Sequence, residues 1–233
     1  MLSPHGHVEH ALSLVDDGEA TWMHVEPGTA PSLVDFLDRM RFMLRVEVAE
    51  VTGQWAVVAE PLAQPHPAGH LTRVLSGGRE TFIPRGELDA AATAAGELAG
   101  IWAHEALRVA AHRPRAGRET DHRTIVQEVG WIPAAVHLEK GCYRGQETVA
   151  RVHNLGRPPR RLVFLHLDGS VDALPRHGDP VLLGERQVGF VTTAVRHFEL
   201  GPVALALVKR AIPVDEPLVA GGVPGTQEVV VPG

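Results

Sequence analysis

The last third of the chain constrains the fold most, because it is a series of short apolar runs separated regularly by glycine and proline. Each run after Arg161 has the length of a strand, which is typical of a small all-β barrel or sandwich. We therefore expect a C-terminal β-barrel domain over residues 156–233, after a basic, turn-rich boundary at residues 151–161. The runs read LVFLHL, PVLLG, QVGFVTTAV, PVALALVK, PLVAG and QEVVV.

The first 155 residues show a different pattern, in which predicted strands are mixed with helices. Asp-Gly at positions 17–18 lies between two apolar runs and is a strong hairpin signal. Ser32 is positioned to cap a following amphipathic helix. The order ββαββ indicates an α+β unit with a helix on an antiparallel sheet. The predicted elements are strands at 7–15 and 20–26, a helix at 32–43, and strands at 44–51 and 54–59.

The middle of the chain predicts a connector followed by helix. Residues 60–85 contain four prolines and read as an irregular connector with short strands. Residues 86–112 are alanine-rich and predict a helix with one apolar face, broken at Gly96 or Gly100. We expect Pro114 to end it.

Composition narrows the class of protein. The chain has 233 residues and a net charge of −6, which argues against non-specific binding of nucleic acid. A single cysteine cannot form an internal disulfide, which suits a reducing compartment, and it could supply at most one ligand to an iron–sulfur cluster. The N-terminus has no signal-peptide pattern, and no run approaches the ~20 apolar residues of a membrane span. We expect a cytoplasmic protein that binds neither nucleic acid nor membrane.

Fourteen histidines invite a metal site. His5, His7 and His10 form a cluster, and His66 and His70 are four residues apart in a Pro/Gly-rich loop. No H-E-x-x-H and no Cys/His spacing accompanies them. We therefore expect structural or solvent-facing histidines and no metal.

The only cysteine, Cys142, has neighbours that a packing residue would not need. Gly141 and Gly145 flank it, and glycine lets a ligand or a second chain segment approach the backbone closely. Lys140 precedes it by two residues, so both side chains share one face if the segment is extended, and lysine favours the reactive thiolate. Composition alone would favour an inert buried thiol, whereas this arrangement favours a functional one.

Residues 140–147 read KGCYRGQE and are followed by TVAR. This pattern resembles the signature of the YgfZ-type folate-binding proteins, which are relatives of the aminomethyltransferase (T-protein) of the glycine cleavage system. LSPHGHVEHAL, TFIPRGEL, ALRVAAHRPRAG and ETDHRTIVQE resemble further landmarks of that family. The resemblance implies an α+β, T-protein-like fold of antiparallel sheets with packed helices over residues 1–155, then a small all-β barrel, with folate in a central hole.

Several positions depart from the family pattern. The family has a segment before LSPHG, whereas Met1 lies almost directly at that point, so we expect either an upstream start or a natural short form. A pair of aspartates in the T-protein corresponds to His10 and Ala11. An acidic residue of the folate site corresponds to Ala110.

Tetrahydrofolate, or a derivative of it, makes three chemical demands. The N–H edge of its pterin suits a carboxylate, its rings suit aromatic or apolar walls, and its glutamate tail suits arginine or lysine. Glu128 is the first choice for the pterin, because it matches the glutamate of the family's P-x-E pattern. The candidates are Glu128, Glu119 and Asp121 for the pterin, Trp102 and Trp131 as walls, Arg108, Arg123 and Arg151 for the tail, and Tyr143, Gln146 and Glu147 within the signature.

These side chains also have ordinary structural interpretations. Trp102 lies on an apolar helix face, where a core position is the commoner role. Glu119 and Asp121 are by default solvated loop charges. The arginines between residues 157 and 161 are most simply a solvated linker.

Two functions fit the resemblance. The first is a folate-binding accessory protein for iron–sulfur client proteins, in which Cys142, activated by Lys140, carries the chemistry. The second is a tetrahydrofolate-dependent aminomethyl or one-carbon transferase, which needs an acid–base group that positions 10 and 11 do not supply as a carboxylate. A third interpretation is a folded remnant that binds no folate. An exposed sheet edge would also favour a homodimer.

Overall fold

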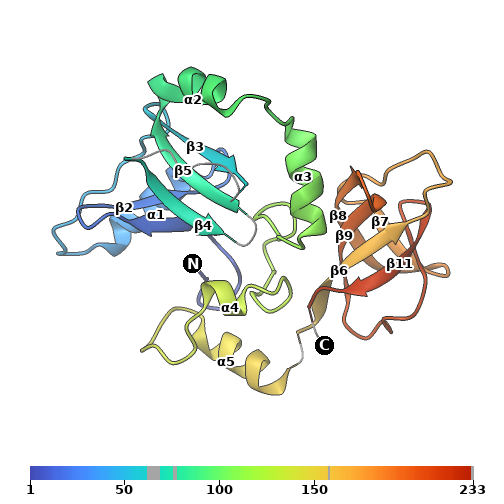
Figure 1. Cartoon of the computed structure of the whole chain (residues 1–233). Coiled ribbons are helices and arrows are strands. Elements are labelled where there is room, and N and C mark those ends of the chain that lie inside the picture. The colour runs from blue at the N-terminus through green and yellow to red at the C-terminus, as the bar shows by residue number, and fades with distance from the viewer. Residues whose placement is uncertain (62–68, 76–77, 157, 232–233) are drawn as a thin grey trace. The chain divides into compact units, whose positions relative to one another are not determined.

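The computed structural model describes the whole chain except residues 62–68, 76–77, 157 and 232–233. The chain divides into two compact units. The first consists of residues 1–10 and 99–233, and the second of residues 11–98. The boundary predicted between residues 155 and 156 lies inside the first unit, just before the barrel, and stays a prediction (Figure 1).

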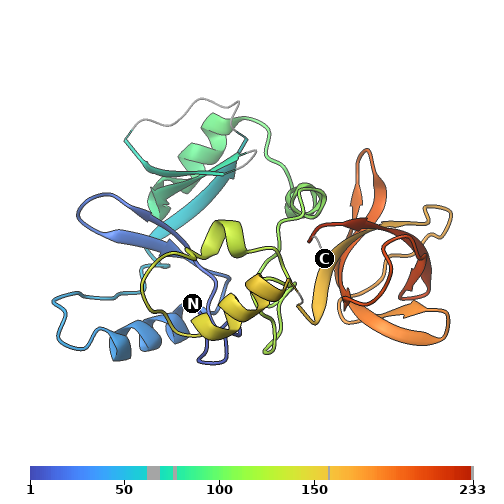
Figure 2. The ribbon, with the colours of Figure 1, turned by 90° about the horizontal axis from the view of Figure 1, so that it is seen from below.

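The C-terminal part of the first unit is a closed antiparallel barrel, as the sequence predicts. Figure 2 shows its strands forming a ring. The order around the barrel is β10-β11-β6-β9-β8-β7. The strands are β6 (Arg160–Leu167), β7 (Pro180–Leu183), β8 (Arg186–His197), β9 (Gly201–Lys209), β10 (Leu218–Ala220) and β11 (Val223–Val229).

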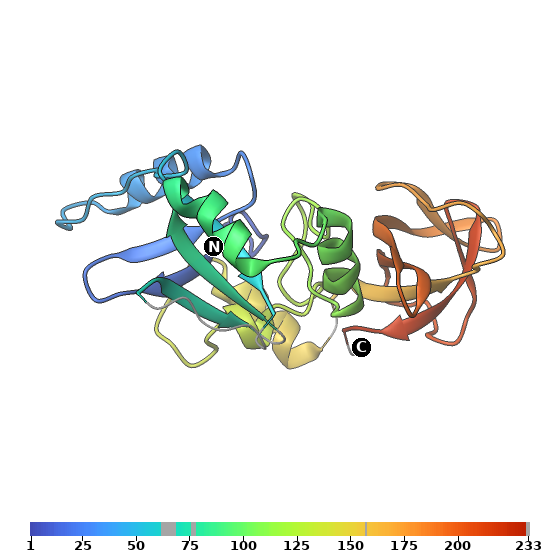
Figure 3. The ribbon, with the colours of Figure 1, turned by 45° about the horizontal axis from the view of Figure 1, so that its top comes forward.

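The apolar runs of β6 and β9 are continuous because both faces of these strands are buried. On β6, Val163 and Leu165 point into the barrel, whereas Leu162 and Phe164 belong to a second core outside it. The helix α3 (Ile101–Ala110) packs its Val109 into this second core. Figure 3 shows α3 alongside the barrel wall. The alternation that normally marks a half-buried strand is therefore missing from these runs.

Two further helices complete the first unit. They are α4 (Ile132–Ala135) and α5 (Gln146–Leu155). The N-terminal segment pairs with residues before α4, because His7 bridges Ile125 and the Val8 N–H donates to the Thr124 carbonyl at 2.8 Å. This pairing attaches the N-terminal segment to the loop that precedes α4.

The second unit contains the predicted hairpin, formed by β1 (Ser13–Asp16) and β2 (Thr21–His24). The carboxylates of Asp16 and Asp17 accept backbone N–H groups within the turn, and Gly18 has a φ of 91°. A second, three-stranded sheet has the order β3-β5-β4. Its strands are β3 (Trp55–Glu60), β4 (Leu71–Leu75) and β5 (Gly78–Pro84).

One predicted strand is wrong. Residues 44–51 form no strand, and β3 pairs with β5 instead of with that segment. The turn at residues 52–54 leads into β3, whose aromatic Trp55 packs edge-on against Trp22 with ring centroids 4.6 Å apart. β3 is therefore held by its pairing with β5 and by a ring contact with the separate β1-β2 hairpin, and the preceding residues remain without a strand partner in the described structure.

The helices of the second unit are close to prediction. The helix α1 spans Ala30–Met40, but its N-cap is Thr29, and Ser32 Oγ donates to the Thr29 carbonyl, so the predicted Ser32 cap is wrong. The predicted break in the next helical stretch is confirmed: a 3₁₀ turn (Arg85–Glu87) and α2 (Leu88–Ala95) end at Gly96, and α3 begins after Gly100.

Candidate functional site

The signature segment is fixed by a contact between two glycines that are far apart in the sequence. Gly6 and Gly145 have φ values of 80° and 81°. A Cβ on Gly145 would lie 2.6 Å from the Ser3 carbonyl oxygen and 2.7 Å from Gly6 Cα. Only glycine fits here, for both conformation and space. The segment that approaches Gly145 is therefore the N-terminal turn, which packs against the start of α5.

The N-terminal turn is rigidly built around Ser3. Its Oγ accepts the backbone N–H groups of His5 and His7 at 3.2 and 3.1 Å, and its own N–H donates to the His7 carbonyl at 2.8 Å. These hydrogen bonds fix the backbone of the turn that carries His5 and His7.

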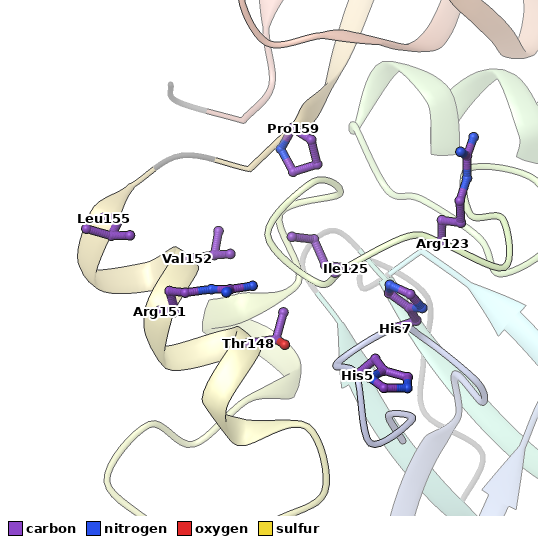
Figure 4. A pocket seen from close by; sticks show the side chains of 9 residues that line it. All are labelled: His5, His7, Arg123, Ile125, Thr148, Arg151, Val152, Leu155 and Pro159. Carbon is purple, nitrogen blue, oxygen red and sulfur yellow. The ribbon is translucent and has the colours of Figure 1, made fainter.

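A pocket of about 540 Å³ lies between this turn and α5. Figure 4 shows Arg151 extending from α5 toward the turn that carries His5 and His7, while the guanidinium of Arg123 points away from the helix. The volume falls in the range of small-molecule sites. The lining residues are His5, His7, Arg123, Ile125, Thr148, Arg151, Val152, Leu155 and Pro159. We call this the basic pocket.

The basic pocket has no acidic side chain in its lining. Within the described structure, neither the Arg151 nor the Arg123 guanidinium forms an ion pair or hydrogen bond. One wall is apolar, with Ile125, Val152 and Leu155. A guanidinium beside imidazoles and an apolar wall suits an organic anion, because arginine binds carboxylate and phosphate in bidentate geometry.

Cys142 is exposed in the loop before α5 and does not line the basic pocket. The Gln146 Nε2 donates to its Sγ at 3.8 Å, and the Gln146 Oε1 accepts the Tyr143 N–H at 3.0 Å. The ammonium group of Lys140 lies 5.5 Å from the Tyr143 ring centroid. The loop bends at Lys140–Gly141, so it is not the extended segment in which both side chains would share a face. Glu147 is exposed on the first turn of α5.

Glu119 is fully buried, with 0% of its surface exposed. Its Oε1 accepts the hydroxyls of Thr192 and Thr193 at 3.0 and 2.5 Å. Its Oε2 accepts Arg108 Nη1 at 3.1 Å and the Arg115 N–H at 2.8 Å. The predicted folate candidates Glu119 and Arg108 thus tie α3 to β8, and a contact of either with folate stays a prediction.

Glu105 extends the same network. Its carboxylate pairs with Arg108 at 3.0 Å and with Arg115 at 2.9 Å. Burial raises the pKa of Glu105, but the two guanidinium groups outweigh it and hold the pKa below its ordinary value. The carboxylate stays ionised, and Arg108 is shared between two of them.

Glu128, the first choice for the pterin, is 1% exposed. Its two oxygens accept Arg160 Nε and Nη2 at 3.0 and 2.8 Å, and the Ile125 N–H at 3.3 Å. Arg160 also pairs with Asp121 at 2.6 Å. The hydrogen bond from Arg160 holds the pKa of Asp121 well below its usual range, and Asp121 raises that of Arg160. A role of Glu128 in folate binding stays a prediction.

The linker interpretation of the arginines near residue 160 is wrong for two of them. Arg160 joins Glu128 to Asp121, as above, and Arg161 is buried and donates to the Ile212 carbonyl at 2.9 Å. Asp121 is likewise ion-paired and not merely solvated. Arg157 lies outside the described residues.

The two tryptophans differ. Trp102 is 77% exposed near the start of α3, so the core position expected for it is wrong, and it does not line the basic pocket. Trp131 packs against the core between α3 and the barrel. A wall role for Trp102 stays a prediction.

Sequence reasoning brought Arg151 and Arg123 to this site but missed His5 and His7 as lining residues. The sequence signal for them was the pattern His5-Gly6-His7, because a turn at the glycine can direct both rings to one side. Among the described residues, no group of three or more His, Cys, Asp or Glu is placed to hold a metal ion. In the same part of the chain, no helix is long and apolar enough to cross a membrane.

The barrel itself identifies a known domain. Residues 160–227 match the glycine cleavage T-protein C-terminal barrel domain. This range covers β6 to most of β11. These residues therefore form a T-protein-type barrel.

Two curated relatives and one solved structure extend the likeness. The chain is 31% identical over 203 residues to the aminomethyltransferase of Rubrobacter xylanophilus, covering 71% of this chain and 53% of that protein. It is 30% identical over 224 residues to the aminomethyltransferase of Geobacillus kaustophilus, covering 88% and 57%. These comparisons support the T-protein-like superfamily for this chain.

The T-protein-like fold extends over the whole chain. The crystal structure of the glycine cleavage system aminomethyltransferase T from Bartonella henselae superposes with a TM-score of 0.75, 18% identity, and coverage of 100% of this chain and 74% of that one. At this identity the likeness concerns the fold alone. The chain spans about half the length of the curated relatives it matches.

Proposed function

We propose that this protein binds tetrahydrofolate or a derivative and uses Cys142 to support the assembly or repair of iron–sulfur enzymes. The observation that carries the proposal is that one segment, residues 140–151, contains both an exposed thiol and an arginine of the basic pocket. Its N-terminal half presents an exposed thiol, and its C-terminal half, α5, carries Arg151 into the basic pocket. Anion binding and thiol chemistry are thus supplied by residues 140–151.

The basic pocket suits the benzoyl-glutamate end of folate. The glutamate carboxylates would pair with Arg151 near His5 and His7, and the benzoyl ring would lie on the wall of Ile125 and Val152. The absence of acids among the lining residues favours this assignment, because like charges would repel the tail.

The thiol is accessible to a large partner, as an accessory role requires. Cys142 lies on an exposed loop whose only hydrogen-bonding side chain at the sulfur, among the described residues, is Gln146. A thiolate is both a nucleophile and a ligand for iron. A client protein can therefore reach the sulfur without opening the fold.

The test is Cys142→Ser expressed in cells that lack the protein. We expect loss of iron–sulfur enzyme activity and an unchanged folate affinity, measured by anaerobic calorimetry. Glu139→Gln in the same loop is the matched control and should support the clients normally. Normal client activity in the Cys142→Ser cells would contradict the role of the thiol.

The second candidate is a one-carbon transferase, favoured by the names of the curated relatives. It needs a proton acceptor near the folate. His10 is the titratable group at the position of the T-protein aspartates, and burial lowers its pKa, which favours the neutral imidazole. Transfer of a methylene group from an aminomethylated carrier protein to tetrahydrofolate, abolished by His10→Ala, would favour this function over the first.

A further inference from the structure

The segment between α1 and β3 keeps the sequence pattern of a strand without forming one. Residues 44–48 read LRVEV, with apolar Leu44, Val46 and Val48 alternating with Arg45 and Glu47. In the structure the chain leaves α1 and runs as a loop to β3 (Figures 1 and 2). Such alternation predicts a half-buried strand, so this segment lacks the partner that its pattern requires.

The apolar side chains here are unusually exposed. Phe42 and Met43 are 86% and 81% exposed, and Met40, Leu44 and Val46 are also exposed. Five of the seven residues 40–46 are thus exposed apolar side chains, and the other two are Arg41 and Arg45. Exposed apolar surface of this kind marks a site of interaction or of aggregation.

The backbone of this segment has one edge engaged and one edge open. The Leu44 N–H donates to the Arg41 carbonyl at 2.9 Å, and the Val46 carbonyl accepts Arg41 Nη1 at 2.9 Å. Residues two apart in an extended chain direct their backbone groups to the same edge. In the described structure, the backbone groups of Arg45 and Glu47 make no hydrogen bond, so the opposite edge is open.

We propose that a second copy of this chain pairs with this open edge in antiparallel register about Val46. In that register Arg45 lies opposite the partner copy's residue 47, a glutamate, and the reverse pair is identical by symmetry. Leu44 lies opposite residue 48, a valine, and Val46 opposite itself. The hydrogen-bonded pairs are those of residues 45 and 47, whose backbone groups are open.

Neighbouring registers are less favourable. Pairing about Glu47 places two glutamates opposite each other, and pairing about Arg45 places two arginines opposite each other, which is destabilising. A shift by one residue moves the apolar side chains to the other face. The charge pattern of this segment is therefore self-complementary in one register.

The experiment measures mass against concentration by analytical ultracentrifugation, using the full chain. We expect wild type to form a reversible dimer. Arg45→Glu and Glu47→Arg each put two like-charge pairs in the interface, so each should weaken dimerisation by at least about tenfold. Both side chains are exposed, so folding should not change. The control is Arg186→Glu, which reverses the charge of an exposed residue in the barrel.

Two combinations make the register testable. The double variant Arg45→Glu/Glu47→Arg restores both opposite-charge pairs and should dimerise like wild type. A mixture of the two single variants should form heterodimers, because each glutamate then faces an arginine. A monomeric wild type at all concentrations, a dimer unaffected by either reversal, or a mixture that does not associate would overturn the proposal.

Discussion

Two groups of charged residues in the first unit use arginine in opposite ways. Between α3 and the barrel, Arg108 is buried and shares its guanidinium between Glu105 and Glu119. In the basic pocket, Arg151 is exposed and has no carboxylate among the other lining residues. A buried cation needs a paired anion, because an unpaired one is too costly to desolvate. A solvated cation can remain unpaired until a ligand arrives.

The comparison separates residues that build the fold from residues that can bind. The acidic candidates from the sequence, Glu119 and Glu128, belong to the first kind in this structure, since their oxygens already accept several donors. The basic candidate Arg151 belongs to the second. The same substitution in each group should therefore give different phenotypes.

The largest effect should come from Arg108→Met. The change leaves Glu119, which is fully buried, without its cationic partner, and breaking a buried pair costs about 3–5 kcal/mol. Urea denaturation, followed by a probe in the first unit, measures the loss of unfolding free energy. A cost within about 0.5 kcal/mol, as at ordinary surface sites, would show that the network contributes nothing to stability.

Arg160→Met should cost slightly less, about 3 kcal/mol, at the lower end of the range for broken buried pairs. The folded-state pKa of Asp121 lies below its ordinary value of 3.8 because of Arg160. Its contribution is therefore present above that pH and is lost as the pH falls through the folded-state pKa. The difference in unfolding free energy between wild type and variant should shrink below about pH 4. A difference in unfolding free energy that does not change with pH would show that the Asp121–Arg160 pair does not contribute to stability.

Gly145→Ala tests whether the glycine contact that holds the N-terminal turn beside the basic pocket contributes to stability. The substitution forces a side chain into a left-handed conformation and against the Ser3 carbonyl, at a cost of about 1–3 kcal/mol. Gly141→Ala is the control, because a Cβ there meets nothing within 4 Å. Equal stabilities of the two variants would show that the glycine contact does not hold the N-terminal turn.

Arg151→Met should have the smallest effect on stability, within about 0.5 kcal/mol, because the exposed guanidinium has no partner in the described structure. Thermal and urea denaturation measure it against Arg108→Met. A large loss would place Arg151 with the residues that build the fold.

The sequence was most informative where one pattern determined one structure. The barrel, the hairpin at residues 17–18 and the helix break at Gly96 all follow from local signals, and the structure confirms them. Residues 44–51 failed because strand pairing depends on a partner, and alternation does not reveal which partner is present.

The candidate site could be predicted only in part, for a related reason. The motif indicated Arg151, but nothing local showed that Glu128 and Asp121 would share Arg160, because this contact spans 32 to 39 residues. Likewise, the contact that brings the turn of His5 and His7 to the start of α5 joins Gly6 to Gly145, which are far apart in the sequence. Pairing of charges over long sequence distances decides which candidates remain available to a ligand.

The central claim is tested most directly by anaerobic calorimetric titration of the full chain with tetrahydrofolate and its 5-formyl derivative. We expect saturable binding by wild type and by Arg186→Met, an exposed arginine of the barrel. Arg151→Met should bind at least about tenfold more weakly, as expected for loss of a charged hydrogen bond. Equal affinities of Arg151→Met and wild type, or no binding by a folded wild-type sample, would contradict the assignment of the basic pocket to folate.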